Sequence, residues 1–235
     1  MSDFLREVDE DYRRDQLLAL WKRYGLWLAS VAAVAVLAVG AGVWWRDYQA
    51  GRRQAVAERY EAALTALDAG QVEQGLSTLA QVSEEGIPGY RVLGLLARAR
   101  ALLSQGRRDE AVASYEALAA SEDVPALYSS LGTLLAAQAR LDELSAAEVE
   151  ARLAPLGAVG APWAASANEL IATAFLKEGH NDKARELFGL IAVDPTAPAG
   201  VRGRAANIGS MLGPAPATPP PHDEAGMTPA EGLPR

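Results

Sequence analysis

The chain has 235 residues and a formal net charge of −8, from 22 basic and 30 acidic side chains. This acidic balance excludes a protein that binds nucleic acid through a basic face, because such proteins carry a positive patch or stripe. The absence of cysteine excludes disulfides and thiolate metal sites. The length is sufficient for a membrane anchor and one further domain with a buried core.

The first segment, residues 1–24, is predicted to form a cytoplasmic amphipathic helix. Large apolar side chains recur in it at helical spacing, with charged residues between them. Such a helix can lie against a membrane surface or dock on a cytoplasmic partner. Its acidic residues weaken the first of these two interpretations.

The second segment, residues 25–45, is predicted to be a transmembrane helix. Leu26 to Trp45 contains no charged residue and reaches about 30 Å as a helix, the thickness of a bilayer's hydrocarbon core. Trp27 lies near its start and Trp44 at its end, and such aromatic rings settle at headgroup level. The alternatives are a cleaved signal peptide, which a long charged leader disfavours, and a buried core helix, which normally has a polar face.

The flanking charges favour an orientation with the N-terminus inside the cell and the C-terminal part outside. Five basic residues precede the apolar segment and four follow it closely, so the positive-inside bias is weak and the opposite orientation stays open. Ala38 and Gly42 form a small-xxx-small pair that lets a partner helix approach closely. Chance pairs of this kind are common in an alanine-rich segment.

Residues 46–212 contain helix formers throughout and an internal repeat, whereas residues 213–235 are predicted to be a disordered, proline-rich tail. Gly70, Gly106 and Gly179 are each predicted to end one helix and precede another. A small residue follows each glycine after five positions, a larger one after nine and an aliphatic one after twelve. These positions are Gly75, Ala111 and Ala184; Leu79, Tyr115 and Phe188; and Val82, Leu118 and Ile191.

The glycine separations of 36 and 73 residues correspond to one repeat and then two. The missing copy is predicted to begin near Asp142, and because Ala151 occupies its large position, it is either degenerate or slightly shifted. A first helix is expected before each of the four units, at about 47–69, 89–104, 125–140 and 162–178. Pro88, Pro125 and Pro162 are predicted to lie at the starts of the second, third and fourth of these helices. Gly94 and Ala167 are small residues predicted to lie at close contacts between helices.

This pattern resembles the tetratricopeptide repeat, whose period is about 34 residues. The segments GRRDEAVASYEALAA and GHNDKARELFGLIAVDP are similar to the second helix of that repeat and its following turn, and GQVEQGLSTLAQV is a weaker match. The resemblance implies an all-α fold, with one N-terminal transmembrane helix followed by a tetratricopeptide-like solenoid over residues 46–212. Tyr115 and Phe188 are then wedges in its core. The alternative is an irregular helical bundle.

The order of segments along residues 1–212 resembles the family of the ancillary subunit of the SecYEG translocon, a membrane-anchored bacterial protein with tetratricopeptide-like repeats in the periplasm. The resemblance lies in REVDEDYRRDQ, LWKRYG, the exit WWRDYQ and the weak repeats; the proline-rich tail is outside it. It implies a single-pass protein of the bacterial inner membrane with a cytoplasmic N-terminus. The implied partners are the SecYEG translocon, periplasmic chaperones, unfolded or extended polypeptides, and membrane lipid around one span.

The sequence contains no catalytic motif, so neither enzyme activity nor a cofactor or metal is predicted. His180 lies in a repeat turn and His222 in the tail, and no nucleophile accompanies either of them. Binding is the expected function, through a concave surface lined by the first helix of each pair. Five side chains are candidates for contacts with an extended peptide, unless they merely solvate a helix face: Arg91, Arg98, Arg100, Asn168 and Lys177.

Three functions remain open from the sequence. The first is a translocon-associated module that links exported polypeptides to periplasmic chaperones. The second is a scaffold for envelope assembly or cell division with no role in export. The third is a receptor whose repeats lie in the cytosol, which requires the opposite orientation in the membrane.

Overall fold

The computed structural model describes residues 2–213, and over these residues the protein forms nine helices and no strand. The predicted all-α fold is therefore confirmed. The predicted tail lies outside the described residues from position 214 onward. The helices are α1 (Ser2–Asp68), α2 (Val72–Glu84), α3 (Pro88–Ser104), α4 (Arg108–Ala119), α5 (Ala126–Ala139), α6 (Ala146–Leu153), α7 (Ala164–Lys177), α8 (Asn181–Val193) and α9 (Ala199–Met211).

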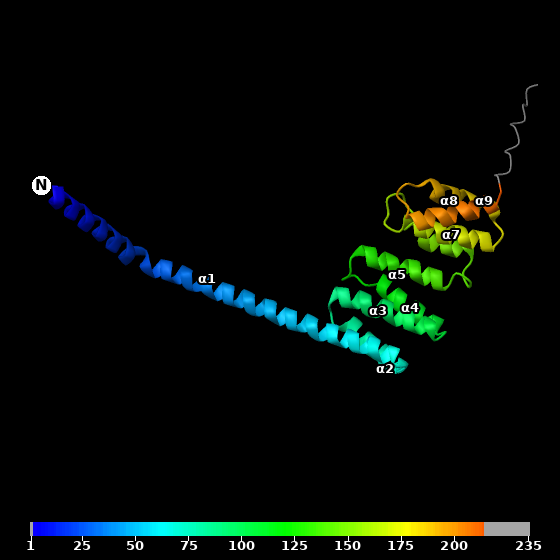
Figure 1. Ribbon diagram of the computed structural model, residues 1–235, viewed down its shortest axis with the longest axis horizontal. Coiled ribbons are helices and arrows are strands. Elements are labelled where there is room, and N and C mark those ends of the chain that lie inside the picture. Colours follow the sequence, from blue (N-terminus) through cyan, green and yellow to red (C-terminus); the bar gives the residue numbers. More distant parts are fainter. Residues whose placement is uncertain (1, 214–235) are drawn as a thin grey trace, which may run out of the picture.

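Helix α1 joins the apolar segment to the first repeat without a break (Figure 1). Its apolar part stands clear of the other helices, and side chains such as Leu26, Leu37 and Trp44 are exposed. By length and composition, this is one helix that can cross a membrane. The last turns of α1 instead bury Val56, Ala63 and other small side chains against the repeats.

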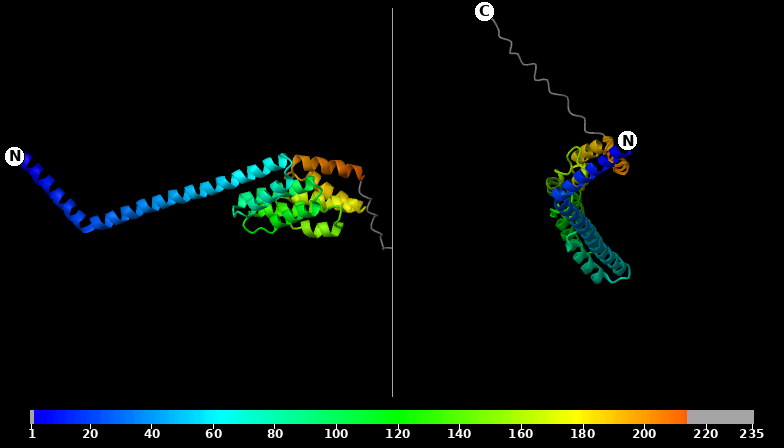
Figure 2. Two further views of the ribbon diagram at one scale, coloured as in Figure 1. Left: turned by 90° about the horizontal axis from the view of Figure 1, so that it is seen from below. Right: turned by 90° about the vertical axis from the view of Figure 1, so that its left-hand side faces the viewer.

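The remaining helices form a stack of antiparallel pairs that rises from α2 at the bottom of Figure 1 to α9 at the top, and each helix packs mainly against the next one along the chain (Figures 1 and 2). Contacts between neighbours of this kind define a solenoid, whose units cannot bury their apolar faces alone. The final helix, α9, packs against α8 and also touches α7. It covers the apolar side chains of α7 and α8 at the end of the stack.

Three turns end the first helix of a pair in the same way. Gly70, Gly106 and Gly179 have φ values of 77°, 74° and 81°, in the left-handed region that favours glycine. At the second turn the Gly106 N–H donates to the Leu103 carbonyl (3.0 Å), and the Arg107 N–H donates to the Leu102 carbonyl (2.9 Å). This pair of bonds is a Schellman motif, so the predicted glycine caps are confirmed.

The predicted packing positions are also confirmed. Phe188 is fully buried, and Tyr115 is exposed by only 7%. A Cβ atom added to Gly75 would lie 2.6 Å from the Leu67 side chain, and one added to Gly94 would lie 2.9 Å from the Leu79 carbonyl. These small residues therefore let neighbouring helices approach closely, as the sequence pattern indicated.

The weak third copy is shifted in register. Helix α6 buries Ala146, Val149 and Leu153, whereas Ala151 faces solvent. The helix has only eight residues and begins with a capping box between Ser145 and Glu148. Helix α6 starts at Ala146, two residues later than the period predicts from Val72 and Arg108, the starts of α2 and α4, because this capping box fixes where the helix starts.

The prolines at the helix starts differ in position. Pro88 is the first residue of α3, as predicted, whereas Pro125 is the N-cap of α5 and Pro162 precedes the N-cap residue Trp163. The extended backbone of Pro125 (φ −56°, ψ 140°) suits an N-cap, where a proline also requires no N–H.

Candidate functional site

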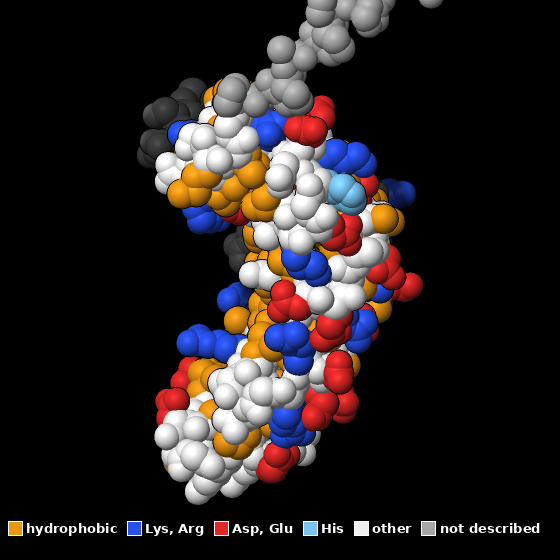
Figure 3. Space-filling view, turned by 90° about the vertical axis from the view of Figure 1, so that its right-hand side faces the viewer, with side chains coloured by type: hydrophobic (Ala, Val, Ile, Leu, Met, Phe, Trp, Pro, Cys, Tyr) orange, Lys and Arg blue, Asp and Glu red, His pale blue; other side chains and the backbone are white. Residues whose placement is uncertain are grey.

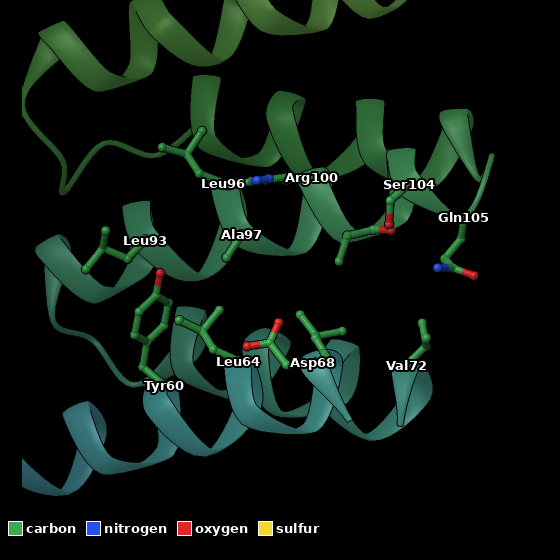
Figure 4. Close-up of a pocket in the computed structure, with 12 residues that line it drawn as sticks. Tyr60, Leu64, Asp68, Val72, Leu93, Leu96, Ala97, Arg100, Ser104 and Gln105 are labelled. Carbon is green, nitrogen blue, oxygen red and sulfur yellow. The ribbon is translucent and has the colours of Figure 1, made fainter. Parts of the chain in front are cut away.

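The described residues form a groove of about 600 Å³ between the end of α1 and α3 (Figure 4). Tyr60 and Leu64 of α1 face Leu93 and Ala97 of α3 across it. The Tyr60 ring also meets Tyr90 edge-on, with ring centroids 6.3 Å apart. These contacts hold the aromatic wall of the groove in place, while Leu93 remains 44% exposed to a ligand.

The groove becomes polar toward one end. Asp68 of α1 and Arg100 of α3 line that end together with Ser104 and Gln105. An apolar wall with a few polar groups at one end is the usual composition of a binding site, since the polar groups fix the orientation of the ligand. This groove can hold apolar side chains of a peptide and meet its backbone or a charged side chain at the polar end.

The solenoid is curved, as Figure 3 shows from the side away from the start of α1. Hydrophobic and some basic side chains are visible in the hollow of the curve, and acidic and basic side chains cover the rounded side. The charged side chains are consistent with a solvated outer surface, and the hollow is the surface suited to a partner.

Of the five candidate peptide contacts, Arg100 lies at the groove. Arg91 instead pairs with Asp123 (2.8 Å) and donates from Nε to the Ser83 carbonyl (3.1 Å). Arg98 donates to the Ser114 hydroxyl (3.0 Å). Both arginines thus connect α3 to neighbouring elements.

The other two candidates also make internal hydrogen bonds. The Asn168 amide donates to the Gly157 carbonyl (3.1 Å). Lys177 Nζ donates to the Leu141 carbonyl (2.7 Å) and the Leu144 carbonyl (3.2 Å), in the turn before α6. These side chains stabilise the contact between consecutive units.

Several ion pairs join residues one repeat apart. Arg107 contacts Glu73 (2.6 Å), and Arg204 makes two bonds to Glu169 (2.7 and 2.8 Å). Arg107 also pairs with Glu110 within α4, and this hydrogen bond raises the pKa of the guanidinium and lowers the pKa of the Glu110 carboxyl. The pairs brace the stack, and opposite charges one repeat apart were the sequence signal that could have predicted them.

Apart from Arg100, the groove residues were not predicted as a site. Tyr60 and Leu64 were visible only as part of a helical pattern, and Leu93 carried no separate signal. The signal that could have predicted the groove is the excess of apolar residues on α3. This helix exposes Leu93 and Leu103 in addition to the apolar residues that it buries in the core.

The described residues offer no group of three or more His, Cys, Asp or Glu side chains placed to hold a metal. His180 lies at the exposed turn before α8. It is 3.6 Å from the Glu178 carboxylate, and its ring meets Phe175 edge-on. These contacts describe a turn residue, and no nucleophile is among them.

The curved stack and its apolar groove define a helical-repeat protein that binds other proteins. Comparison with known families matches residues 19–194 to the tetratricopeptide repeat-like domain. The match covers most of the chain, and the chain therefore belongs to this family. Domains of this type are interaction modules and are typically not enzymes. No curated protein and no solved structure matches the chain. The predicted repeat family is confirmed, whereas the link to the translocon stays a prediction.

Proposed function

We propose that the protein is a membrane-anchored interaction module that associates with the Sec translocon and links exported polypeptides to periplasmic chaperones. In this proposal residues 1–24 are cytoplasmic, residues 25–45 cross the bacterial inner membrane, and residues 46–212 lie in the periplasm. The tail from residue 213 extends into the periplasm.

The observation that carries the proposal is the continuity of α1. The helix that contains the exposed apolar segment also supplies Tyr60 and Leu64 to the groove wall. Tyr60 lies about 22 Å beyond Trp45 along the helix, at about 1.5 Å of rise per residue. A span in the membrane therefore holds the groove at a short, fixed height above the surface, where a polypeptide leaves a channel.

The chemistry of the groove fits an unfolded client. Apolar side chains on both walls accept apolar side chains of an extended segment without selecting a particular sequence. Asp68 and Arg100 supply one acidic and one basic group at its polar end, which suits clients of either charge. A rigid, folded partner would instead require a larger complementary surface.

The first test is capture of the tagged full-length protein from mildly solubilised membranes, followed by identification of the proteins that accompany it. Recovery of the translocon with periplasmic chaperones supports the proposal. Recovery of division or envelope-assembly proteins without the channel contradicts it and favours the scaffold function.

A pair of variants tests the role of the groove. Leu93→Asp places a charge on the groove wall, and Leu103→Asp places the same charge on an exposed leucine of the same helix outside that groove. We expect the first variant to lose crosslinks to a nascent exported chain and the second to keep them. Equal crosslinking by both variants contradicts a client site in this groove.

The orientation has its own test. A reporter fused after Arg235 is expected to be active in the periplasm and inactive in the cytoplasm. The opposite result contradicts the export function and favours a cytosolic receptor.

A further inference from the structure

The loops that lead into α3, α5, α7 and α9 lie along one edge of the solenoid, on the side from which α1 enters (Figure 1). We call this the entry edge; it consists of residues 85–87, 120–125, 154–163 and 194–198. Polar contacts connect neighbouring parts of this edge. They are Arg52 to the Glu85 carbonyl (3.2 Å), Arg91 to Asp123 (2.8 Å) and the Trp163 indole to the Leu127 carbonyl (2.9 Å).

The first loop of the entry edge lies close to the level at which the apolar segment of α1 ends. The first of its loops lines a small cavity together with α1, formed by Gly86, Ile87 and Pro88 and by Gln49, Arg52 and Arg53. These α1 residues follow Trp45 by about 6–12 Å of helix. A headgroup layer is about 5–8 Å thick on each side of the hydrocarbon core. A bilayer that α1 spans therefore brings its surface near this first loop, and the other entry-edge loops face the same side of the solenoid (Figure 1).

One loop of the entry edge, residues 154–163, is apolar throughout. Its sequence, APLGAVGAPW, has no charged side chain, and the Trp163 indole is its one hydrogen-bonding side chain. Val159 is fully exposed near its centre, and Pro155 and Ala158 are exposed as well. Exposed apolar side chains beside a tryptophan are typical of segments that lie at the boundary between headgroups and acyl chains.

Within the described residues, the opposite edge of the solenoid has no apolar loop of comparable length. Three of its loops, residues 105–107, 140–145 and 178–180, carry charged side chains, and charged residues of α4 and α8 follow two of them. Figure 3 faces this edge and shows basic and acidic side chains across it. Charged side chains also occur in the entry-edge loops 85–87, 120–125 and 194–198, so loop 154–163 is the segment that stands apart from both edges.

We propose that loop 154–163 contacts the bilayer that α1 spans, with Val159 at the boundary between headgroups and acyl chains. The inference rests on the proposed function only in requiring that α1 is a membrane span, and it requires no translocon. Exposed acidic side chains (Glu84 and Glu122) and basic ones (Arg52 and Arg53) both lie at or beside the entry edge, so a zwitterionic bilayer suits the contact. With two points of attachment, the solenoid lies along the membrane and its groove keeps one orientation.

The natural absence of cysteine makes a direct test available, because a single introduced thiol carries the only label. Val159→Cys probes the loop, Val34→Cys probes the span and Gln105→Cys probes the opposite edge. Each full-length variant is labelled with a fluorophore and reconstituted in phosphatidylcholine vesicles, with nitroxide either on the lipid headgroup or within the acyl chain. We expect the headgroup nitroxide to quench the loop label, the acyl nitroxide to quench the span label, and neither to quench the third.

The outcomes separate the two proposals. A quenched span label with an unquenched loop label overturns the loop contact and leaves the membrane span in place. An unquenched span label overturns both. Equal quenching at the loop and at the opposite edge overturns the loop contact as well, because it indicates non-specific adsorption.

A second pair of variants guards against an effect of the label at Val159. With the label moved to Ala158→Cys, the additional change Val159→Asp is expected to abolish quenching by the headgroup nitroxide, since a charge opposes entry into the boundary. Leu103→Asp in the same background is expected to leave the quenching unchanged. Quenching that survives Val159→Asp overturns the loop contact.

Discussion

Replacement of Phe188 by alanine should destabilise the C-terminal half of the solenoid by about 3–5 kcal/mol. Phe188 is fully buried on α8, among residues of α7, α8 and α9 that include Ala184, Ile191 and Val201. Removal of the ring loses its transfer free energy and leaves a cavity that close-packed neighbours fill only in part. Ala184 and Gly209 are too small to move into the space, so the upper part of the range is expected.

The assay is urea unfolding of the full-length protein in detergent, followed by far-ultraviolet circular dichroism and by amide hydrogen exchange. The core residues of α5–α9 form a cluster separate from the one shared by α2–α5. Because a solenoid transmits stability mainly between neighbours, the loss of protection should concentrate in α7–α9 and fade toward α2.

The matched control is Val193→Ala on the same helix, whose side chain is 78% exposed. We expect that change to alter the free energy of unfolding by less than about 0.5 kcal/mol. A loss below about 1 kcal/mol for Phe188→Ala would refute the reasoning, because it would mean that the repeat register does not place this ring in the core.

Three further predictions concern the turns and helix contacts. Gly132→Ala should cost about 1–3 kcal/mol in urea unfolding, because its Cβ would lie 2.7 Å from backbone atoms of α4; a neutral change would contradict this contact. Gly106→Ala should cost about 1–2 kcal/mol through its positive φ, whereas Gly189→Ala, in an open helical position, should be neutral or stabilising in the same assay. Arg107 stabilises the charged form of Glu110, so the stabilisation from this pair is complete above the ordinary pKa of the carboxyl and is lost as pH falls through its lowered folded-state pKa. Glu110→Gln should therefore flatten the acid side of a plot of unfolding free energy against pH. An unchanged acid side would show that the pair contributes nothing to stability.

The helix pairs and their caps were predictable because they depend on local rules. Glycine in the left-handed conformation, a small residue five positions later and a large one nine positions later are all visible in one sequence. The third copy was predictable only to within two residues, because no glycine marks its turn. Ser145 and Glu148 set the start of α6 instead, and that signal is weaker than a repeat glycine.

The roles of surface side chains were less predictable, because they depend on which elements the solenoid brings together. Arg91 and Lys177 lie on first helices, as a peptide-binding side chain would. Their partners are Asp123 and two carbonyls before α6, at sequence separations close to one repeat. A period of about 34 residues thus specifies not only where helices lie but also which charges meet.

The position of the groove follows from the double role of α1. In a free-standing repeat domain, the first helix needs a polar outer face, because nothing precedes it in the stack. Here that helix continues into the apolar segment, and its last turns bury Val56, Ala63 and Ala66 against the repeats while Tyr60 and Leu64 line the groove. The apolar segment and one wall of the groove therefore share one continuous helix. A displacement of the apolar segment is expected to reach this wall directly, whereas the other wall, on α3, is held by its packing against α2 and α4.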